Sequence, residues 1–489
     1  MANPTVMATP LPDKLAVGRA PGRREAATTA GRKDLVTRWG GRLGCDALAS
    51  LRNRRIQVLG LLSVSSGMPL GFVWITLQFF LVDLSIPKAT IGILSGVSLP
   101  WTVKFLWSPL VDRYALRWPG RRRSWVFLSQ LALAVAFGAF ALLGWKLMAL
   151  GPAGRPSSTP WLIGGLAMLI AFLSATQDIA IDAYAVEVLE PDEQGPVSGL
   201  RIMYYRLGML LAGAFAVSAS EWVPWPTLFA AIGVVFVLLT GLTLAAEEPR
   251  RPSVPPRSLG KAVVEPFRTY FTREDAAAIA LFLVFYKFGD SMGGTMVNPF
   301  LKDLCFTNAE AGAALKVVGT AATIGGAALG ALAMTRVGLG RALWIFGFLQ
   351  AGANLLYSAT ALSRGAPLDV HLCGGLPAVS LATRAWAYTS VAGEYAAQGL
   401  ASAAQGALLL RVCDKRYSAT QFALLSSLFA LGRWGAGLPS GWLVQELGYP
   451  AFFALACGLA VPGLLFLQRI APIRQREVTA APTAPPQPS

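Results

Sequence analysis

Charged residues are scarce in this chain: Asp, Glu, Lys and Arg make up only 14% of its 489 residues. Ordinary soluble domains carry roughly 25%, so most of this chain must lie out of water. Histidine occurs once, as His371, which leaves a histidine-based catalytic site without a partner. The five cysteines are scattered, with no CxxC pair, and this spacing predicts neither a disulfide framework nor a metal site. We therefore expect no cofactor and no metal, and the lack of a catalytic cluster argues against an enzyme.

Acidic residues are fewer than basic ones, and the formal net charge is +16. A basic chain can indicate nucleic-acid binding, but no zinc-type cysteine pair or base-stacking motif supports that function here. Membrane topology explains the excess better, because Lys and Arg accumulate in cytoplasmic loops. The basic stretch at the start shows no apolar periodicity and does not lead into a secretory cleavage site. We expect 1–55 to be a disordered basic arm and 472–489 to be a disordered tail.

Long apolar runs take up most of the remaining chain. About twelve of them can be drawn, and each is long enough to cross a bilayer as a helix. Their predicted bounds are 56–80, 89–111, 124–149, 160–184, 197–219, 225–246, 276–301, 309–334, 341–363, 385–411, 418–443 and 450–471. The polar, proline-rich and basic linker at 247–275 divides them into two sets of six. The sequence thus predicts an all-α membrane protein with an N-terminal bundle at 56–246 and a C-terminal bundle at 276–471.

Basic residues collect in alternate connections between these segments. They precede the first segment, follow the second at Arg121, Arg122 and Arg123, fill the linker at 247–275, and follow the tenth at Arg411, Lys415 and Arg416. The intervening connections hold few. Because Lys and Arg mark the cytoplasmic side, we expect both termini and the linker to be cytoplasmic.

Four acidic residues lie inside the apolar segments. Asp178 and Asp182 are four residues apart in the fourth segment, so they share one helix face. Asp290 and Glu394 lie near the middle of the seventh and tenth segments, counting about 1.5 Å per residue. A charged side chain at mid-membrane costs about 2.5–3.5 kcal/mol on insertion scales, and such residues are usually functional. A polar interior of this kind indicates transport of a small molecule across the bilayer.

Three cations lie at similar depths and leave a simpler alternative open. Lys104 could form a structural ion pair with Asp178 or Asp182, and Lys287 could pair with Asp290 three residues later. Such pairs would neutralise buried charge that is costly when unpaired. Arg433 lies in the eleventh segment at about the middle of the membrane.

One cytoplasmic connection resembles the loop motif of the major facilitator superfamily. The stretch SPLVDRYALRWPGRRR leaves the second segment with Asp112, Arg113, Gly120 and Arg121 in the order that this motif has. A weaker copy, GALAMTRVGLGRAL, leaves the eighth segment without the acid. The resemblance implies two related six-helix bundles with a substrate site between them and a gating or structural role for the motif residues.

The chain also resembles one branch of that superfamily, the AmpG-type muropeptide permeases. The stretches that carry the resemblance run in order from residue 67 to residue 426: GMPLGF, KFLWSPLVDRY, GRRRSW, SATQDIAIDAY, YRLGML, YKFGD, RALWIFGFLQ and SATQFALLS. It implies a secondary active transporter in the inner membrane that imports anhydro-muropeptides with protons by alternating access. The same branch includes transporters of acetyl-CoA and of siderophores, which remain the alternatives.

The resemblance implies roles for the charges above, because segments one, four, seven and ten line the cavity of this fold. Lys287 and Arg433 would bind substrate carboxylates. Polar contacts to the substrate would come from Gln177, Glu394 and Gln398. The coupled proton would be carried by Asp290 or by Asp178, with Asp182 beside it. Lys104 would hold Asp178 charged, as part of a gate.

Overall fold

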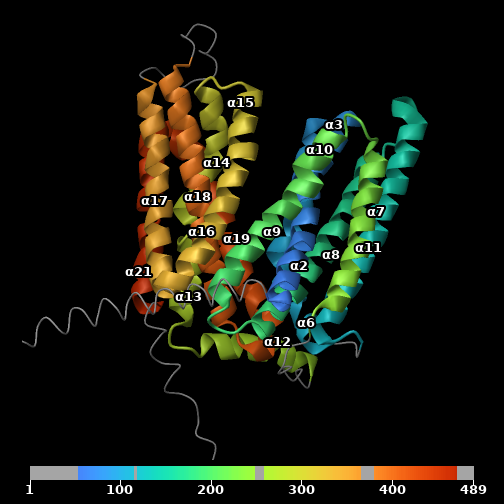
Figure 1. Ribbon diagram of the computed structural model, residues 1–489. Coiled ribbons are helices and arrows are strands. Elements are labelled where there is room, and N and C mark those ends of the chain that lie inside the picture. The colour runs from blue at the N-terminus through green and yellow to red at the C-terminus, as the bar shows by residue number, and fades with distance from the viewer. Residues whose placement is uncertain (1–52, 115–117, 248–257, 365–378, 471–489) are drawn as a thin grey trace, which may run out of the picture. The chain divides into compact units, whose positions relative to one another are not determined.

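The computed structural model describes residues 53–114, 118–247, 258–364 and 379–470. All of these residues belong to one compact unit, and within these ranges the regular elements are helices only. The predicted tail, almost all of the predicted arm, His371 and part of the linker lie outside the described ranges. Figure 1 shows the helices side by side, with the short helix α12 lying across one end of them.

The first half of the chain is a series of long helical runs joined by short turns. In chain order its elements are α2 (Arg54–Gly71), η1 (Phe72–Thr76), α3 (Leu77–Asp83), α4 (Lys88–Leu94), η2 (Ser95–Ser98), α5 (Leu99–Val103), η3 (Lys104–Leu106), α6 (Ser108–Arg113), α7 (Arg121–Gly154), α8 (Thr159–Val188), α9 (Gln194–Leu210), η4 (Leu211–Phe215), α10 (Ala216–Ala219) and α11 (Trp225–Ala245). The predicted second segment, 89–111, is therefore a run of short helical pieces.

The second half follows the same plan after the linker. Its elements are α12 (Leu259–Phe271), α13 (Ala276–Phe285), α14 (Phe288–Asp303), α15 (Asn308–Gly312), η5 (Ala313–Gly319), α16 (Thr320–Val337), α17 (Leu339–Ser363), α18 (Leu381–Val412), η7 (Lys415–Tyr417), α19 (Ser418–Gly437), α20 (Ser440–Gly458) and α21 (Val461–Ile470). Gly448, with φ 73°, breaks α20 between the two predicted segments 418–443 and 450–471. The segment predicted at 385–411 is part of α18, one of the longest helices described.

Nine helical runs in the described part of the chain are long and apolar enough to cross a membrane. They coincide with nine of the predicted apolar segments, the last run also including the end of the eleventh. The other predicted segments, 89–111, 385–411 and most of 418–443, are helical as well. The prediction of an all-helical membrane protein is confirmed.

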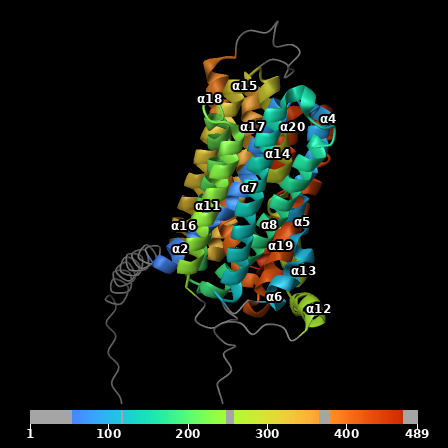
Figure 2. The ribbon, with the colours of Figure 1, turned by 90° about the vertical axis from the view of Figure 1, so that its right-hand side faces the viewer.

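The two halves share a hydrophobic core at one end only. One core, made of α2, α8, α13, α16, α18 and α19 residues, includes side chains of both halves. A second core lies wholly within the first half, around Phe72, Phe137 and Phe229. A third lies wholly within the second half, around Phe300, Tyr357 and Phe453. We call the end with the shared core, where α12 also lies, the linker end, and the opposite end the Asp83 end (Figures 1 and 2).

Close helix packing depends on glycine at several positions. A Cβ on Gly208 of α9 would lie 2.2 Å from the Val64 carbonyl oxygen of α2, and one on Gly67 would lie 2.0 Å from the Tyr205 carbonyl oxygen. Small residues that let helix backbones approach closely are typical of membrane helices. Gly325 of α16, by contrast, has no atom within 4 Å of a Cβ.

The two halves repeat one another in detail at the Asp83 end. Asp83 accepts a hydrogen bond from the Trp225 indole at 2.7 Å, and Asp303 accepts one from the Tyr449 hydroxyl at 2.6 Å. Each acid is followed two residues later by a residue with positive φ, Ser85 at 58° and Cys305 at 66°.

An arginine completes each copy. Arg155 donates to the Leu84 carbonyl at 3.1 Å, and Arg364 donates to the Leu304 carbonyl at 3.0 Å. This repeat is clearer than the loop copy that the sequence alone indicated.

Cys305 is disulfide-bonded, so the prediction that the cysteines form no disulfide is wrong at this position. Sequence spacing failed here because it does not report which cysteines lie together in the fold.

Candidate functional site

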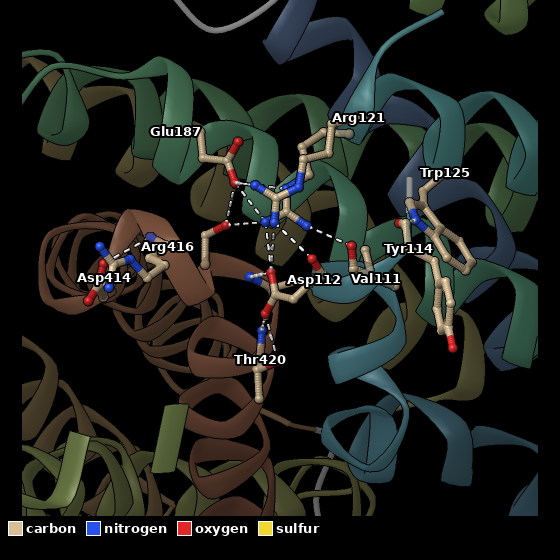
Figure 3. A network of polar contacts seen from close by, with 12 residues as sticks. Val111, Asp112, Tyr114, Arg121, Trp125, Glu187, Asp414, Arg416 and Thr420 are labelled. Atoms are coloured by element: carbon tan, nitrogen blue, oxygen red, sulfur yellow. Dashed lines mark hydrogen bonds and ion pairs between the residues drawn. The ribbon is translucent and has the colours of Figure 1, made fainter. Parts of the chain in front are cut away.

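The linker end is held by a buried arginine that lies between two acids. The Arg122 side chain, at the start of α7, is fully buried. Its Nη2 atom donates to Asp112 Oδ1 at 2.7 Å, and its Nε atom donates to Glu187 Oε1 at 2.8 Å. Figure 3 shows the two acids converging from α6 and from the end of α8. Because α6, α7 and α8 all belong to the first half, this part of the network fixes that half internally.

The same network extends to the second half through the start of α19. Asp112 Oδ2 accepts from the Thr420 backbone N–H at 2.8 Å and from the Thr420 hydroxyl at 2.6 Å. Ser418 donates its hydroxyl to Glu187 at 2.8 Å. A carboxylate at a helix N-terminus satisfies free N–H groups and interacts favourably with the helix dipole. Asp112 therefore joins the two halves where their core is shared.

The motif residues predicted for gating lie around this network but make different contacts with it. Arg121 donates to the Asp112 carbonyl at 2.9 Å and lies 4.0 Å from Asp112 Oδ1 and 3.9 Å from Glu187 Oε1. The guanidinium of Arg113 lies over the Tyr114 ring. Gly120 precedes α7 with φ 144°, a conformation that favours glycine. The neighbouring Arg122, which was not among the predicted motif residues, lies at the centre of the network.

Glu187, Ser418 and Thr420 were not identified from the sequence. Glu187 lies just past the apolar segment predicted at 160–184. Charged residues are common in the connections between such segments, so its position alone predicts no role. Ser418 and Thr420 come from the other half of the chain, and no local pattern links them to Asp112.

A second polar group lies inside the first half, around Asp182. Arg201 of α9 donates to Asp182 Oδ1 at 2.5 Å, and Lys104 approaches Asp182 Oδ2 at 3.5 Å. Of the two partners that the sequence left open for Lys104, the structure therefore selects Asp182. Arg201 also approaches the Ser63 hydroxyl at 3.4 Å, so this group joins α2, α8 and α9.

Asp178 and Gln177 lie deeper in the same half. Asp178 is buried and hydrogen-bonds Ser66, and its Oδ1 atom has no hydrogen-bond partner among the described residues. Gln177 is fully buried and donates its amide to the Ser65 hydroxyl at 2.8 Å. Both side chains are thus engaged with α2 in this structure, and each keeps one oxygen without a partner among the described residues.

Lys287 lies at a break in the seventh predicted segment, between α13 and α14. Its amine donates to the Ser402 hydroxyl at 2.7 Å and to the Gln398 carbonyl at 3.4 Å, both on α18. No ion pair joins Lys287 to Asp290 within 4.0 Å among the described residues. The intrahelical pair that the sequence left open is therefore replaced by contacts across to α18.

Asp290 and Glu394 form a buried carboxyl pair between α14 and α18. Both side chains are at least nine-tenths buried, and the two carboxyl groups lie close enough to hydrogen-bond when one of them is protonated. Two carboxyl groups can share a hydrogen bond only if one of them holds a proton. Tyr357 donates to Glu394 Oε2 at 3.5 Å, and Asp290 Oδ1 has no other partner among the described residues. The arrangement can hold and release one proton next to the Lys287 amine.

Arg206 of α9 connects this pair to the first half. It donates to the Gln398 side-chain oxygen at 3.3 Å and lies close enough to Glu394 and Arg433 to interact with both electrostatically. Arg433 of α19 is exposed, and its guanidinium lies over the Trp74 ring of η1, 5.7 Å from the centroid. Both contacts therefore run between the halves.

These three cations lack acidic partners. Arg206, Lys287 and Arg433 form no ion pair within 4.0 Å in the part of the chain that the structure describes. The three cations outnumber the two carboxyl groups of the nearby Asp290 and Glu394. The group is therefore net positive, which suits an anionic ligand.

Arg201 and Arg206 were missed by the sequence analysis. Both lie inside the apolar segment predicted at 197–219, where a cation is as costly as an acid. A cation inside an apolar segment is therefore a sequence signal of the same kind as the four intramembrane acids.

Tyr417 lies outside the helical spans, next to the Asp112 network. Its hydroxyl donates to Glu265 of α12. Burial and this hydrogen bond raise the pKa of the Tyr417 hydroxyl above its ordinary value. The bond therefore persists at neutral pH and ties α12 to the start of α19.

Comparisons with known proteins agree on the kind of molecule. Residues 59–413 match the family model of the Major Facilitator Superfamily. The chain is 36% identical over 415 residues to the anhydromuropeptide permease of Escherichia coli strain K12, covering 84% of this chain and 79% of that protein.

Solved structures show the same fold at low sequence identity. A bacterial homologue of the iron transporter ferroportin in its outward-facing state has a TM-score of 0.62 at 16% identity, covering 85% of this chain and 99% of that one. A proton:xylose symporter has a TM-score of 0.61 at 13% identity, covering 86% and 96%.

Proposed function

The chain belongs to the major facilitator superfamily and, within it, to the AmpG-type muropeptide permease family, and we propose that it imports anhydro-muropeptides together with protons. The superfamily and the fold indicate a membrane transporter and not an enzyme. The proposal adds the substrate, the coupling to protons, alternating access and a location in the cell inner membrane. The partners are then a small-molecule substrate, protons and the bilayer.

We infer twelve membrane-spanning segments in two bundles, at 56–246 and 276–471, with the linker 247–275 and both termini in the cytoplasm. Nine runs meet the length and hydropathy of a span, and α18, α19 and the pieces from α4 to α6 supply the remaining three. The repeated acid, arginine and aromatic contacts at the Asp83 end support two related bundles. The disulfide at Cys305 supports an exterior position for that end, because disulfides persist in oxidising compartments.

The conformation fits a state closed toward the cytoplasm. The halves share their core and the Asp112 network at the linker end, while the cores nearer the Asp83 end are separate. For substrate to leave inward, the contacts of Asp112 with Thr420 and of Glu187 with Ser418 must break. Arg122 would then stay hydrogen-bonded to both acids within the first half, so that the cost of opening is confined to the start of α19.

The observation that carries the substrate assignment is the group of three cations without acidic partners. Arg206, Lys287 and Arg433 lie on α9, α13–α14 and α19, so a carboxylate bound among them would contact both halves. Their net positive surroundings suit a ligand with peptide carboxylates, as a muropeptide has. Gln398 connects Arg206 and Lys287 and would exchange those contacts for substrate. The exposed Trp74 ring beside Arg433 offers an apolar face for a sugar.

Proton coupling follows from the neighbours of the Asp290–Glu394 pair. A substrate carboxylate bound to Lys287 would weaken the attraction of that amine for the pair. The pair would then hold its proton more firmly, so substrate and proton would occupy the site together. Asp178, with a free acceptor atom, is the second candidate, and Asp182 is engaged by Arg201 and Lys104 in a structural or gating role.

Uptake by proteoliposomes tests the function directly. The purified protein should accumulate radiolabelled anhydro-muropeptide when a pH gradient, acid outside, is imposed, and unlabelled muropeptide should compete. Acetyl-CoA and a ferric siderophore, the alternatives within the family, should not compete. Accumulation of either alternative in place of muropeptide would overturn the substrate assignment, while uptake of muropeptide without a pH gradient would overturn the coupling.

A further inference from the structure

The linker contains a helix whose outer face has no protein partner in the described residues. α12 (Leu259–Phe271) begins at Ser258, whose hydroxyl accepts from the Lys261 backbone N–H. Its inner face, formed by Ala262, Pro266 and Tyr270, is buried. This helix was not expected from the polar, proline-rich composition of the linker, and the sequence signal for it is an apolar side chain every three to four residues.

The outer face of α12 combines apolar and basic side chains. Val264 and Phe271 are seven residues apart, so they share one side of the helix, and each is 60% exposed. Lys261 and Arg268, also seven apart, lie on the adjacent side and are exposed. Neither has an ion-pair partner within 4.0 Å in the ranges that the structure describes. An apolar stripe bordered by cations is typical of a helix that lies in a membrane interface.

The position of α12 matches that pattern. It contacts α6, α13 and α19 at the linker end. In Figure 1 it runs across the direction of the long helices, and in Figure 2, turned by 90°, it lies beyond α6 at the edge of the bundle. A helix in this place lies parallel to the plane of the bilayer, at the level where the spans end.

We propose that the outer face of α12 binds anionic phospholipid at the cytoplasmic surface of the membrane. Val264 and Phe271 would enter the boundary of the acyl chains, while Lys261 and Arg268 would contact headgroup phosphates. A soluble anion would satisfy the two cations but would leave the apolar side chains in water. A bilayer lipid satisfies both, and the spans beside α12 already place the bilayer there.

The contacts of α12 carry this interaction to the junction of the halves. Glu265 accepts from the Tyr417 hydroxyl, and the Pro266 carbonyl accepts from Gln421 at 3.2 Å. Both partners lie within one turn of Ser418 and Thr420, which contact Glu187 and Asp112. Lipid bound to α12 therefore stabilises the position of the start of α19, where the two halves are joined.

Photocrosslinking in lipid nanodiscs tests the proposal on the full-length protein. The photoreactive residue p-benzoylphenylalanine replaces Val264, and the discs contain phosphatidylcholine with or without phosphatidylglycerol. Mass spectrometry should find phospholipid attached at this position, with phosphatidylglycerol over-represented relative to its share of the disc. Added inorganic phosphate should not reduce the yield, because the bound group is a lipid.

Two double variants decide whether the preference belongs to α12. Lys261→Gln with Arg268→Gln should reduce the enrichment of phosphatidylglycerol by roughly 25-fold, since each cation near an anionic surface contributes a factor of about five. Arg336→Gln with Arg341→Gln removes two exposed cations at the turn between α16 and α17 and should leave the enrichment unchanged. Crosslinks to protein only, or an equal loss of enrichment in both double variants, would overturn the proposal.

Discussion

The most consequential residues of this protein are charged groups buried where charge is costly. Asp290 and Glu394 lie close enough to hydrogen-bond when one of them is protonated, Asp178 keeps one oxygen without a partner in the described ranges, and Asp182 is neutralised by Arg201 and Lys104. An acid that is fully ion-paired is held in its charged form and does not readily exchange a proton. Two buried carboxyl groups that lie side by side can bind and release one. This difference ranks Asp290 and Glu394 above Asp178, and Asp178 above Asp182.

We expect Asp290→Asn to lose accumulation driven by a pH gradient while it retains exchange of substrate across the membrane. The amide preserves the shape and the hydrogen bond to Glu394 but cannot cycle between protonated and charged forms. Uptake and counterflow in proteoliposomes measure the two properties separately. Asp182→Asn is the matched control: it alters an ion-paired acid and should keep a measurable pH-driven accumulation. An Asp290→Asn protein that still concentrates substrate against its gradient would remove Asp290 from the coupling mechanism.

Arg206 and Lys287 should determine how strongly the protein binds the peptide carboxylates of its substrate. Replacing either with Met removes a charge-assisted hydrogen bond, worth about 1.5–3 kcal/mol, so the KM for a peptide-bearing muropeptide should rise roughly tenfold to a hundredfold. The KM for the disaccharide without peptide should change much less. Competition assays with the two compounds measure the ratio. Equal losses for the two compounds would indicate that these cations support folding or coupling and do not bind the peptide.

At the scale of elements, two contacts stabilise the structure in different ways. One joins the start of α19 to the first half, and the other joins α2 to α9. The start of α19 is joined to the first half by hydrogen bonds to Asp112 and Glu187, which can break and re-form. The α2–α9 contact depends on backbone approach at Gly67 and Gly208, which cannot adjust. The first is suited to a gate and the second to a rigid unit, so substitutions in them should have distinct effects.

Opening of the linker end should be detectable at Cys413. This thiol is buried in the core that the halves share, and burial raises its pKa well above the ordinary value. The thiolate is the reactive form, so a raised pKa keeps maleimide labelling slow at neutral pH. Asp112→Asn places amide donors against the N–H group of Thr420 and should favour the open form.

The pKa of Cys413 would then fall toward its ordinary value, and labelling should be several-fold faster at fixed pH. Cys457, half-buried and outside the shared core, serves as the internal reference. If Asp112→Asn leaves the ratio of the two labelling rates unchanged, the Asp112 network does not control access at this end.

Gly208→Ala should destabilise the protein markedly. The new methyl would meet the Val64 carbonyl at 2.2 Å, and overpacking of this kind costs about 1–3 kcal/mol or more. Gly325→Ala is the control, because its methyl meets nothing within 4 Å and Ala is favoured over Gly in a helix by about 1 kcal/mol. Thermal unfolding of the purified variants should separate them in opposite directions from the wild type. Equal unfolding temperatures would contradict the close approach of α2 and α9.

At the scale of the whole molecule, the apolar segments were predictable because each carries its signal locally. Spans such as Trp225–Ala245 and Leu339–Ser363 lie within a few residues of their predicted bounds. Contacts between distant segments were not predictable: nothing near Asp112 points to Thr420, and nothing near Glu394 selects Asp290 over Lys287 as its neighbour. The helix α12 was hidden because it is short and its apolar residues are interrupted by Lys261, Glu265 and Arg268.

The orientation of the chain in the membrane decides which bilayer surface lies beside α12. Labelling at two positions of the chain can test it. Cys305 lies at the Asp83 end, and its disulfide requires an oxidising compartment. Ser258 lies at the opposite end, immediately before α12. In intact cells treated with a reductant, an impermeant maleimide should label Cys305 but not Ser258→Cys. In inverted vesicles the pattern should reverse, because the cytoplasmic face is then outside. Labelling of Ser258→Cys in intact cells would place the linker outside the cytoplasm, and the bilayer surface beside α12 would then be the outer one.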